Sequence, residues 1–248
     1  MKRRAFLGGM AAGLAALPAR ATERSWVATH GRADFLTAHL YPGARIVLKP
    51  NGLTESIVAL TFDDGPDPVN DPEILRILKE HGAVATFFMV GRNAQRRARL
   101  VREIAAQGHE LGNHTYDHRR LTRCTPEQQA VTLRRTNALI AAVTGQPPRW
   151  FRPPFGSYDE HTLSIARANG LETILWTIDS NDYRDLPPAV IEERVMHDLK
   201  PGAVVLMHSN HRNTVEALPR ILERAREEQF RFVTLTEWKA QMERVAVT

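Results

Sequence analysis

The sequence has one cysteine, few aromatic residues and no hydrophobic run long enough to span a membrane. Cys124 alone excludes an internal disulfide and a zinc site built from cysteines. The longest apolar stretch covers residues 5–17, whereas a membrane-spanning helix needs roughly 20 residues. The composition, 43% hydrophobic and 25% charged, excludes a disordered chain. The length of 248 residues suits one large α/β domain, with two small domains as the alternative.

The net charge of +5 does not indicate a nucleic-acid partner. Four of the basic residues lie in an N-terminal segment that contains no acid, and without them 29 basic residues face 28 acidic ones. These four are Lys2, Arg3, Arg4 and Arg20. No run of Lys or Arg follows, so binding to nucleic acid is not expected.

Residues 1–21 have the pattern of a secretory signal peptide. Basic residues precede the apolar stretch, and Ala19-Arg20-Ala21 follows it as a small-residue cleavage site. The run Arg3-Arg4-Ala5-Phe6-Leu7 is similar to a twin-arginine export signal. We therefore expect cleavage near Ala21 and an exported protein, periplasmic or secreted, with an uncleaved anchor as the alternative.

The remainder divides into an extension at 22–50, which shows little periodicity, and a catalytic domain at 51–248. From Ile57 onward short apolar runs alternate with amphipathic ones, which predicts βαβ units and a parallel sheet. Seven strands are expected, near residues 57–62, 85–90, 110–111, 150–152, 173–178, 203–207 and 230–235.

Seven such strands can close into an incomplete barrel or remain an open, doubly wound sheet. Polar residues follow five of them at the carboxyl ends, and a barrel brings these ends together. The expected fold is therefore α/β, a distorted, incomplete (β/α)7 barrel of parallel strands.

Two adjacent carboxylates, Asp63 and Asp64, follow the first apolar strand. Buried carboxylates are costly unless they are paired or bind a metal. Consecutive strand residues point to opposite faces, so both reach one pocket only if the chain turns, and Gly65-Pro66 predicts that turn. The alternative is an Asp-rich turn with both carboxylates in solvent.

His114 and His118 stand four residues apart, a spacing that brings two imidazoles together on a helical face or in a tight loop. Such a pair suits zinc or a similar metal, although it is often incidental. Asp64 would complete a three-ligand set that leaves positions open for water and substrate. Asp117 is the rival ligand and is expected to face elsewhere.

Three more polar positions follow later strands. Arg152 can pair with Asp63 and hold it ionised, and the backbone N–H of Phe155 is free to donate to an oxyanion because the preceding prolines have none. His208 ends a buried strand as either a satisfied core histidine or a general acid whose pKa Asp182 raises. Each of these residues also has a purely structural alternative.

Taken together, the chain from about Ile57 to Trp238 resembles the polysaccharide deacetylase family, which includes chitin, chitooligosaccharide and peptidoglycan N-acetylglucosamine deacetylases. Five motifs occur in the order of the family, and their joint occurrence by chance is very improbable. They are Thr61–Pro66, His114–His118, Arg152–Gly156, Asp179–Tyr183 and Leu206–His208.

The resemblance implies metal-dependent hydrolysis of an acetyl group from an acetylated glycan. It implies Asp63 as general base, Arg152 as its orienting partner and His208, supported by Asp182, as general acid. The Phe155 N–H, together with the metal, would hold the oxyanion, and the metal ligands implied are Asp64, His114 and His118. Zn²⁺ is the expected metal, and Co²⁺ or Ni²⁺ would also fit these ligands.

Two departures from the family pattern concern the rim of the expected cleft. Tyr183 stands where the family usually has Trp, and Ser209-Asn210-His211 replaces the usual acidic residue after His208. They bear on substrate choice more than on chemistry. The expected substrate is an N-acetylglucosamine-containing glycan of chitooligosaccharide or peptidoglycan type. An O-acetyl esterase acting on xylan and a catalytically inactive glycan-binding module are the alternatives.

Overall fold

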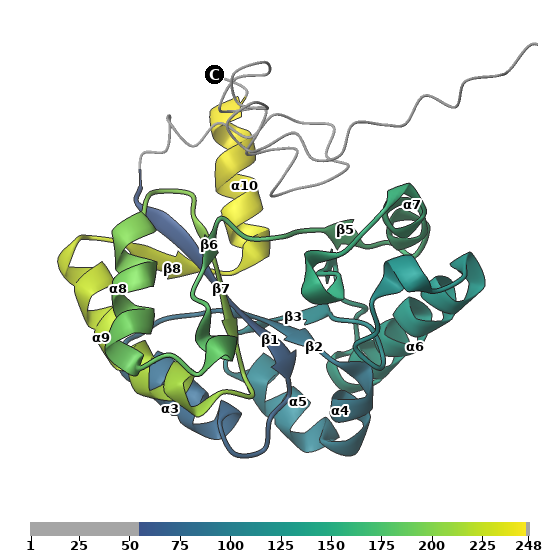
Figure 1. The fold of residues 1–248 in the computed structure, drawn as a ribbon, viewed down its shortest axis with the longest axis horizontal. Helices are drawn as coiled ribbons and strands as arrows, with labels where there is room; N and C mark the ends of the chain where they lie inside the picture. The colour runs from purple at the N-terminus through teal and green to yellow at the C-terminus, as the bar shows by residue number, and fades with distance from the viewer. Residues whose placement is uncertain (1–54, 247–248) are drawn as a thin grey trace, which may run out of the picture.

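The computed structural model describes residues 55–246, and the predicted leader and the extension at 22–50 lie outside them. Parallel strands form one curved sheet in the order β5-β4-β3-β2-β1-β7-β6, with β8 pairing alongside β1 (Figure 1). The strands are β1 (Ile57–Gly65), β2 (Thr86–Met89), β3 (Glu110–Asn113), β4 (Trp150–Phe151), β5 (Glu172–Thr173), β6 (Ile178–Asp179), β7 (Val204–His208) and β8 (Arg231–Val233). The expected distorted, incomplete barrel is confirmed.

The sheet opens where a single strand was predicted at 173–178. The chain pairs there first with β4 and then with β7, on opposite edges of the sheet. The Ile174 N–H donates to the Phe151 carbonyl, and the Thr177 N–H donates to the Val204 carbonyl. Leu175 and Trp176 pair with neither edge, so the predicted strand is split into β5 and β6.

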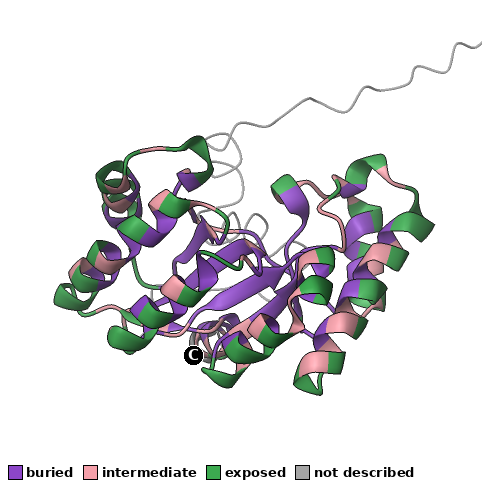
Figure 2. Ribbon diagram, turned by 90° about the horizontal axis from the view of Figure 1, so that it is seen from below, coloured by how far each residue is buried: buried purple, intermediate pink, exposed green. Residues whose placement is uncertain are grey.

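The helices are α3 (Asp71–Glu80), α4 (Gly91–Arg96), α5 (Ala98–Ala106), α6 (Pro126–Thr144), α7 (Glu160–Ala168), α8 (Pro188–Asp198), α9 (Arg212–Glu227) and α10 (Leu235–Ala246), with short 3₁₀ turns at Leu121–Arg123, Pro154–Gly156 and Asp182–Arg184. Helices α3 to α9 surround the outer face of the sheet, with their exposed sides turned to solvent, and α10 packs against the inward-facing cluster (Figure 2). No helix in this described part of the chain is long and apolar enough to span a membrane.

Some helix boundaries follow directly from the sequence and others differ from expectation. Thr125 and Gln128 form a capping box at the start of α6, and Gly145 ends it in the left-handed region with φ 83°. The stretch after β2 forms two short helices, α4 and α5, that meet at Arg97. The final helix α10 was not predicted.

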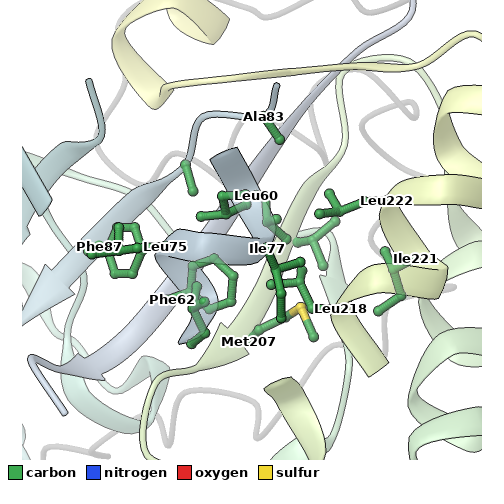
Figure 3. Close-up of a cluster of buried hydrophobic side chains, with 14 of the residues drawn as sticks. Leu60, Phe62, Leu75, Ile77, Ala83, Phe87, Met207, Leu218, Ile221 and Leu222 are labelled. Carbon is green, nitrogen blue, oxygen red and sulfur yellow. The ribbon is translucent and has the colours of Figure 1, made fainter. Parts of the chain in front are cut away.

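The alternation along β1 divides the core into two layers. Val58, Leu60 and Phe62 point outward into a large cluster with the surrounding helices (Figure 3). Ile57 and Ala59 point inward to a second cluster that includes Trp150 and, on α10, Trp238. Because side chains alternate along a strand, the inward row continues through Thr61 to Asp63. The packing of β1 thus directs Asp63 toward the interior.

Candidate active site

A cavity of about 320 Å³ opens at the carboxyl ends of the strands. It brings together residues that are far apart in the sequence, as expected of parallel strands that end on the same edge. Its lining residues are Asp63, Asp64, His114, His118, Phe155, Gly156, Trp176, Asp179, Tyr183, Leu206 and His208. Six of the predicted site residues therefore line one cavity, and Arg152 and Asp182 lie directly behind it, in contact with Asp63 and His208 respectively.

Asp63 is almost completely buried, with 3% of its surface exposed. Burial raises the pKa of its carboxyl group, and the Arg152 guanidinium acts in the opposite direction. Arg152 donates from Nη1 to Asp63 Oδ1 at 2.9 Å, so one carboxylate oxygen is fixed. The other, Oδ2, lies on the His114 side, 3.8 Å from that imidazole's Nε2.

Asp64 reaches the same cavity because the strand has an irregularity at this point. The register of β1 with β2 shifts between Phe62 and Gly65, and Asp64 has a φ of 70°. An extra residue in one strand rotates the side chains that follow it, so consecutive carboxylates no longer point to opposite faces. The required turn therefore lies at Asp64 itself, before the predicted Gly65-Pro66 turn.

The two histidines approach Asp64 from a loop after β3. His118 Nε2 lies 3.1 Å from Asp64 Oδ1, and His114 Nε2 lies 3.6 Å from the same oxygen. Thr115 holds this loop, accepting the His118 N–H at its hydroxyl and donating its own N–H to the Asn113 side chain. The ligand atoms of Asp64, His114 and His118 all lie within 4.8 Å of one another.

The electrostatics of this triplet fit a cation. Asp64 Oδ1 is buried and has no hydrogen-bond partner among the described residues. His114 donates from Nδ1 to the Arg152 carbonyl at 2.7 Å, which leaves the Nε2 lone pair facing Asp64. Burial lowers the pKa of His114 to about 3, which favours the neutral imidazole that binds metals.

Asp117 does not join this group, as expected. It forms an ion pair with Arg119 and lines a separate surface cavity. Asp117, although it lies between the two histidines in the sequence, is therefore directed away from the site.

Arg152 connects the carboxylate to the opening in the sheet. It is fully buried and donates from Nη1 to Asp63 and to the Thr61 hydroxyl, the latter at 2.7 Å. Its Nη2 donates to the Leu175 carbonyl at 2.7 Å, in the segment that pairs with neither edge. The guanidinium also stacks over the Phe88 ring at 4.3 Å. Arg152 thus has two roles. It orients Asp63, and it donates a hydrogen bond to the Leu175 carbonyl, which has no strand partner where the barrel opens.

His208 and Asp182 form the second predicted pair. His208 donates from Nδ1 to Asp182 Oδ1 at 2.7 Å and from its backbone N–H to Oδ2 at 2.7 Å. The Thr214 hydroxyl also donates to Oδ2, at 2.6 Å. Burial lowers the pKa of His208, but the hydrogen bond and charge of Asp182 outweigh it and raise the pKa to about 9. His208 is therefore cationic at neutral pH.

Phe155 supplies a backbone donor at the rim. It has a φ of 61°, and its N–H donates to no other group in the described residues. The next residue, Gly156, also has a positive φ, and a Cβ there would lie 2.9 Å from the Trp176 ring. Glycine at 156 thus allows the loop to lie close against that indole.

Other residues in or beside the cavity received no role from the sequence. Trp176 is half-buried and lines the cavity. The Asn93 side chain donates to the Asp64 carbonyl at 3.1 Å, and the Asn210 side chain donates to Asp64 Oδ2 at 3.4 Å. Tyr183 is 42% exposed and contacts the His208 ring edge-on. Asn93 belongs to no metal-ligand or acid–base pattern, so the sequence carries no signal for it, whereas Tyr183 and Asn210 lie in the two departures expected at the rim of the cleft.

Comparison with known proteins agrees with the family resemblance found in the sequence. The family model for polysaccharide deacetylase matches residues 51–174. A peptidoglycan-N-acetylglucosamine deacetylase of Bacillus cereus is 36% identical over 182 residues, covering 72% of this chain and 66% of the relative. A chitooligosaccharide deacetylase of Bradyrhizobium is 36% identical over 155 residues, covering 62% and 71% of the two chains. The chain therefore spans just under two thirds of the Bacillus cereus relative.

Solved structures agree with the fold. A family 4 carbohydrate esterase pseudoenzyme from Bacillus anthracis superimposes with a TM-score of 0.72 at 35% identity, covering 77% of this chain and 66% of that one. A mutant of this protein with restored enzymatic activity superimposes equally well. The family match, the sequence relatives and the shared fold lead to one conclusion: the chain belongs to the polysaccharide deacetylase family.

Proposed function

We propose that this protein is a metal-dependent hydrolase that removes acetyl groups from N-acetylglucosamine-containing glycans. The observation that carries the proposal is the meeting in one cavity of a buried carboxylate, an Asp-His-His triplet and a cationic histidine. These are the groups needed to take a proton, hold a cation and return a proton. The activities of the peptidoglycan and chitooligosaccharide relatives support this choice of substrate.

Asp64, His114 and His118 are the residues that would hold the metal. An unpartnered carboxylate oxygen facing two imidazole nitrogens is a donor set suited to Zn²⁺, and Co²⁺ or Ni²⁺ would also suit it. The chemistry supplied by a bound divalent cation is polarisation of the acetyl carbonyl and a lower pKa for the attacking water. Three protein ligands leave room for both.

The chain's own residues supply the proton transfers. Asp63, held by Arg152, accepts the proton of the attacking water through Oδ2, the oxygen turned toward the metal ligands. The Phe155 N–H donates to the oxygen that becomes negative as the carbonyl carbon turns tetrahedral. His208, kept cationic by Asp182, donates a proton to the leaving nitrogen. The products are acetate and a free amino sugar.

The rim of the cavity fits a sugar ring. Phe155 is 59% exposed and Tyr183 is 42% exposed, so two aromatic faces border the opening with Trp176 in its wall. Pyranose rings present apolar C–H faces that pack on such side chains, while their hydroxyls need polar partners. Asp179 in the cavity wall is a polar partner of this kind.

The assay that tests this proposal is acetate release from N-acetylglucosamine oligomers, peptidoglycan and acetylated xylan, each with and without chelator. We expect release from the N-acetylated substrates, loss of activity with chelator and recovery with Zn²⁺. Release from xylan alone would instead support the O-acetyl esterase. Glycan binding without any turnover would support the inactive module. This alternative is relevant because one of the related structures is a pseudoenzyme.

We further propose that the protein acts outside the cytoplasm, in the periplasm or as a secreted enzyme. The support is the basic, apolar and Ala-Arg-Ala pattern of residues 1–21. Mass spectrometry of the mature N-terminus tests this, with cleavage near Ala21 as the expected result and an intact leader on a cytoplasmic protein as the contrary one.

A further inference from the structure

A further acidic group is buried next to the turn at Gly65, and the chemistry described above does not use it. Asp71, in the first turn of α3, is 0% exposed. Its Oδ2 accepts the Asp67 N–H at 2.9 Å, whereas its Oδ1 has no hydrogen-bond partner among the described residues. An unpaired buried carboxylate oxygen is costly, so its presence beside a catalytic turn calls for a partner.

The complementary group is the hydroxyl of Ser209. Ser209 is also 0% exposed, and its Oγ has no partner within the described part of the chain. A Cβ added to Gly65 would lie 3.2 Å from Asp71 Oδ2 and 3.2 Å from Ser209 Oγ. The Asp71 carboxylate, through Oδ2, and the Ser209 hydroxyl therefore both border the same side of the Gly65 backbone, where a Cβ would crowd each of them.

Ser209 connects this point to the acid–base machinery. It directly follows His208, and its backbone N–H donates to the Asp63 carbonyl at 2.9 Å. Asp63 and His208 are register partners on β1 and β7. The Ser209 N–H thus ties together the two strand ends that carry these side chains.

We propose that Asp71 and Ser209 are positioning residues that clamp Gly65 between them and fix the separation of Asp63 and His208. The clamp acts through the Ser209 hydroxyl, which donates to the Asp71 carboxylate, and through the Ser209 N–H, which holds the Asp63 carbonyl. This inference rests on the proposed function for its effect on turnover. The clamp itself is a structural feature that can be measured without a substrate.

Ser209→Ala tests the clamp by removing one hydroxyl group and nothing else. We expect kcat for acetate release to fall about tenfold, the scale of a lost hydrogen bond to a charged group, with KM and the affinity for Zn²⁺ unchanged. The amide at position 209 should exchange with deuterium about tenfold faster. Thr136→Val is the matched control, because the buried Thr136 hydroxyl donates to the Thr132 carbonyl, a bond local to α6.

A reciprocal exchange separates positioning from a loss of packing. Asp71→Ser and Ser209→Asp each leave the pair mismatched, and their combination restores a hydroxyl facing a carboxylate. We expect the double variant to recover kcat and slow amide exchange relative to both single variants. Because the double variant restores the pair, it remains informative where a single variant does not fold.

Two results would overturn the clamp. One is a Ser209→Ala variant with wild-type kcat and wild-type amide exchange. The other is a double variant whose losses in kcat and in amide protection equal the combined losses of the two single variants. If the wild-type protein releases no acetate from any glycan, the proposed function fails, and the amide-exchange comparison still decides the clamp.

Discussion

Asp63 and His208 are register partners on the adjacent parallel strands β1 and β7, and both side chains face the same cavity. The Ser209 N–H fastens the two strand ends at this point by donating to the Asp63 carbonyl. Neighbouring side chains in register on two strands point to the same face of the sheet. The sheet itself thus places the two groups proposed to transfer protons side by side, beside the Asp64, His114 and His118 triplet proposed to bind the metal.

The first prediction separates the two adjacent carboxylates. Asp63→Asn should lower kcat by about a hundredfold or more, the scale of a lost general base, while Zn²⁺ affinity is retained. Asp64→Asn should weaken Zn²⁺ binding, because it removes charge from the oxygen that faces both histidines. Metal content and acetate release, measured on both purified variants, check this. Equal loss of zinc in the two variants would contradict the assignment of Asp64, rather than Asp63, as the metal ligand.

The second prediction concerns Arg152. Arg152→Lys should lower both activity and stability, because one ammonium group cannot replace planar donors that reach Asp63, Thr61 and the Leu175 carbonyl together. Breaking a buried charge pair typically costs about 3–5 kcal/mol, and a lysine that keeps the charge should lose less than that. Urea denaturation measures the free energy of unfolding. A Lys variant with wild-type stability and turnover would contradict the dual role of Arg152.

The third prediction is the pH dependence of turnover. The pKa of His208 is raised to about 9, so this residue is protonated below that pH and loses its proton above it. Activity should therefore fall as pH rises through about 9. Asp182→Asn removes the charge that holds the proton, so the alkaline limb should move to lower pH and kcat should fall. An unchanged alkaline limb in that variant would assign it to another group.

The fourth prediction concerns stability as a function of pH. Burial raises the pKa of Asp71 from 3.8 to about 6, and the neighbouring Ser209 hydroxyl and the Asp67 N–H act in the opposite direction. The folded state thus holds this proton more tightly than the unfolded state. The contribution of this proton to the free energy of unfolding is complete below about pH 4 and is lost as pH rises through about 6. The free energy of unfolding changes by roughly 3 kcal/mol over this range.

Asp71→Asn removes this titration. Between pH 4 and 6 the free energy of unfolding of the wild type should fall relative to that of the variant, as measured by urea denaturation across this range. Asp198→Asn, at an exposed position on the outer surface, is the matched control and should run parallel to the wild type. Parallel curves for Asp71→Asn as well would show that Asp71 titrates as an ordinary surface carboxyl.

Much of the candidate site could be predicted, because its residues directly follow the predicted strands. The apolar runs identify the strands, and in a parallel barrel residues such as His114, Arg152 and His208 that follow them must meet at one edge. The His-x-x-x-His spacing and the adjacent Asp pair then indicate a cation site. These inferences need only residue order and the period of two in a strand.

The features that could not be predicted depend on tertiary contacts. The exchange of partners between β5 and β6 cannot be read from a continuous apolar run at 173–178, because each edge pairs with only half of it. The positive φ of Asp64, rather than Gly65-Pro66, turns the second carboxylate inward. The burial of Asp71 beside Ser209 joins residues distant in sequence, and no local pattern marks it.

The central claim is that Asp64, His114 and His118 bind one divalent ion beside Asp63. The most direct measurement is a crystal structure of the zinc-loaded protein with an anomalous difference map at the zinc edge. We expect one peak about 2.0–2.2 Å from Asp64 Oδ1 and from Nε2 of both histidines, with Asp63 beside the ion and still held by Arg152. A map with no peak among these three side chains, or with Asp63 replacing Asp64 as the ligand, would contradict the account.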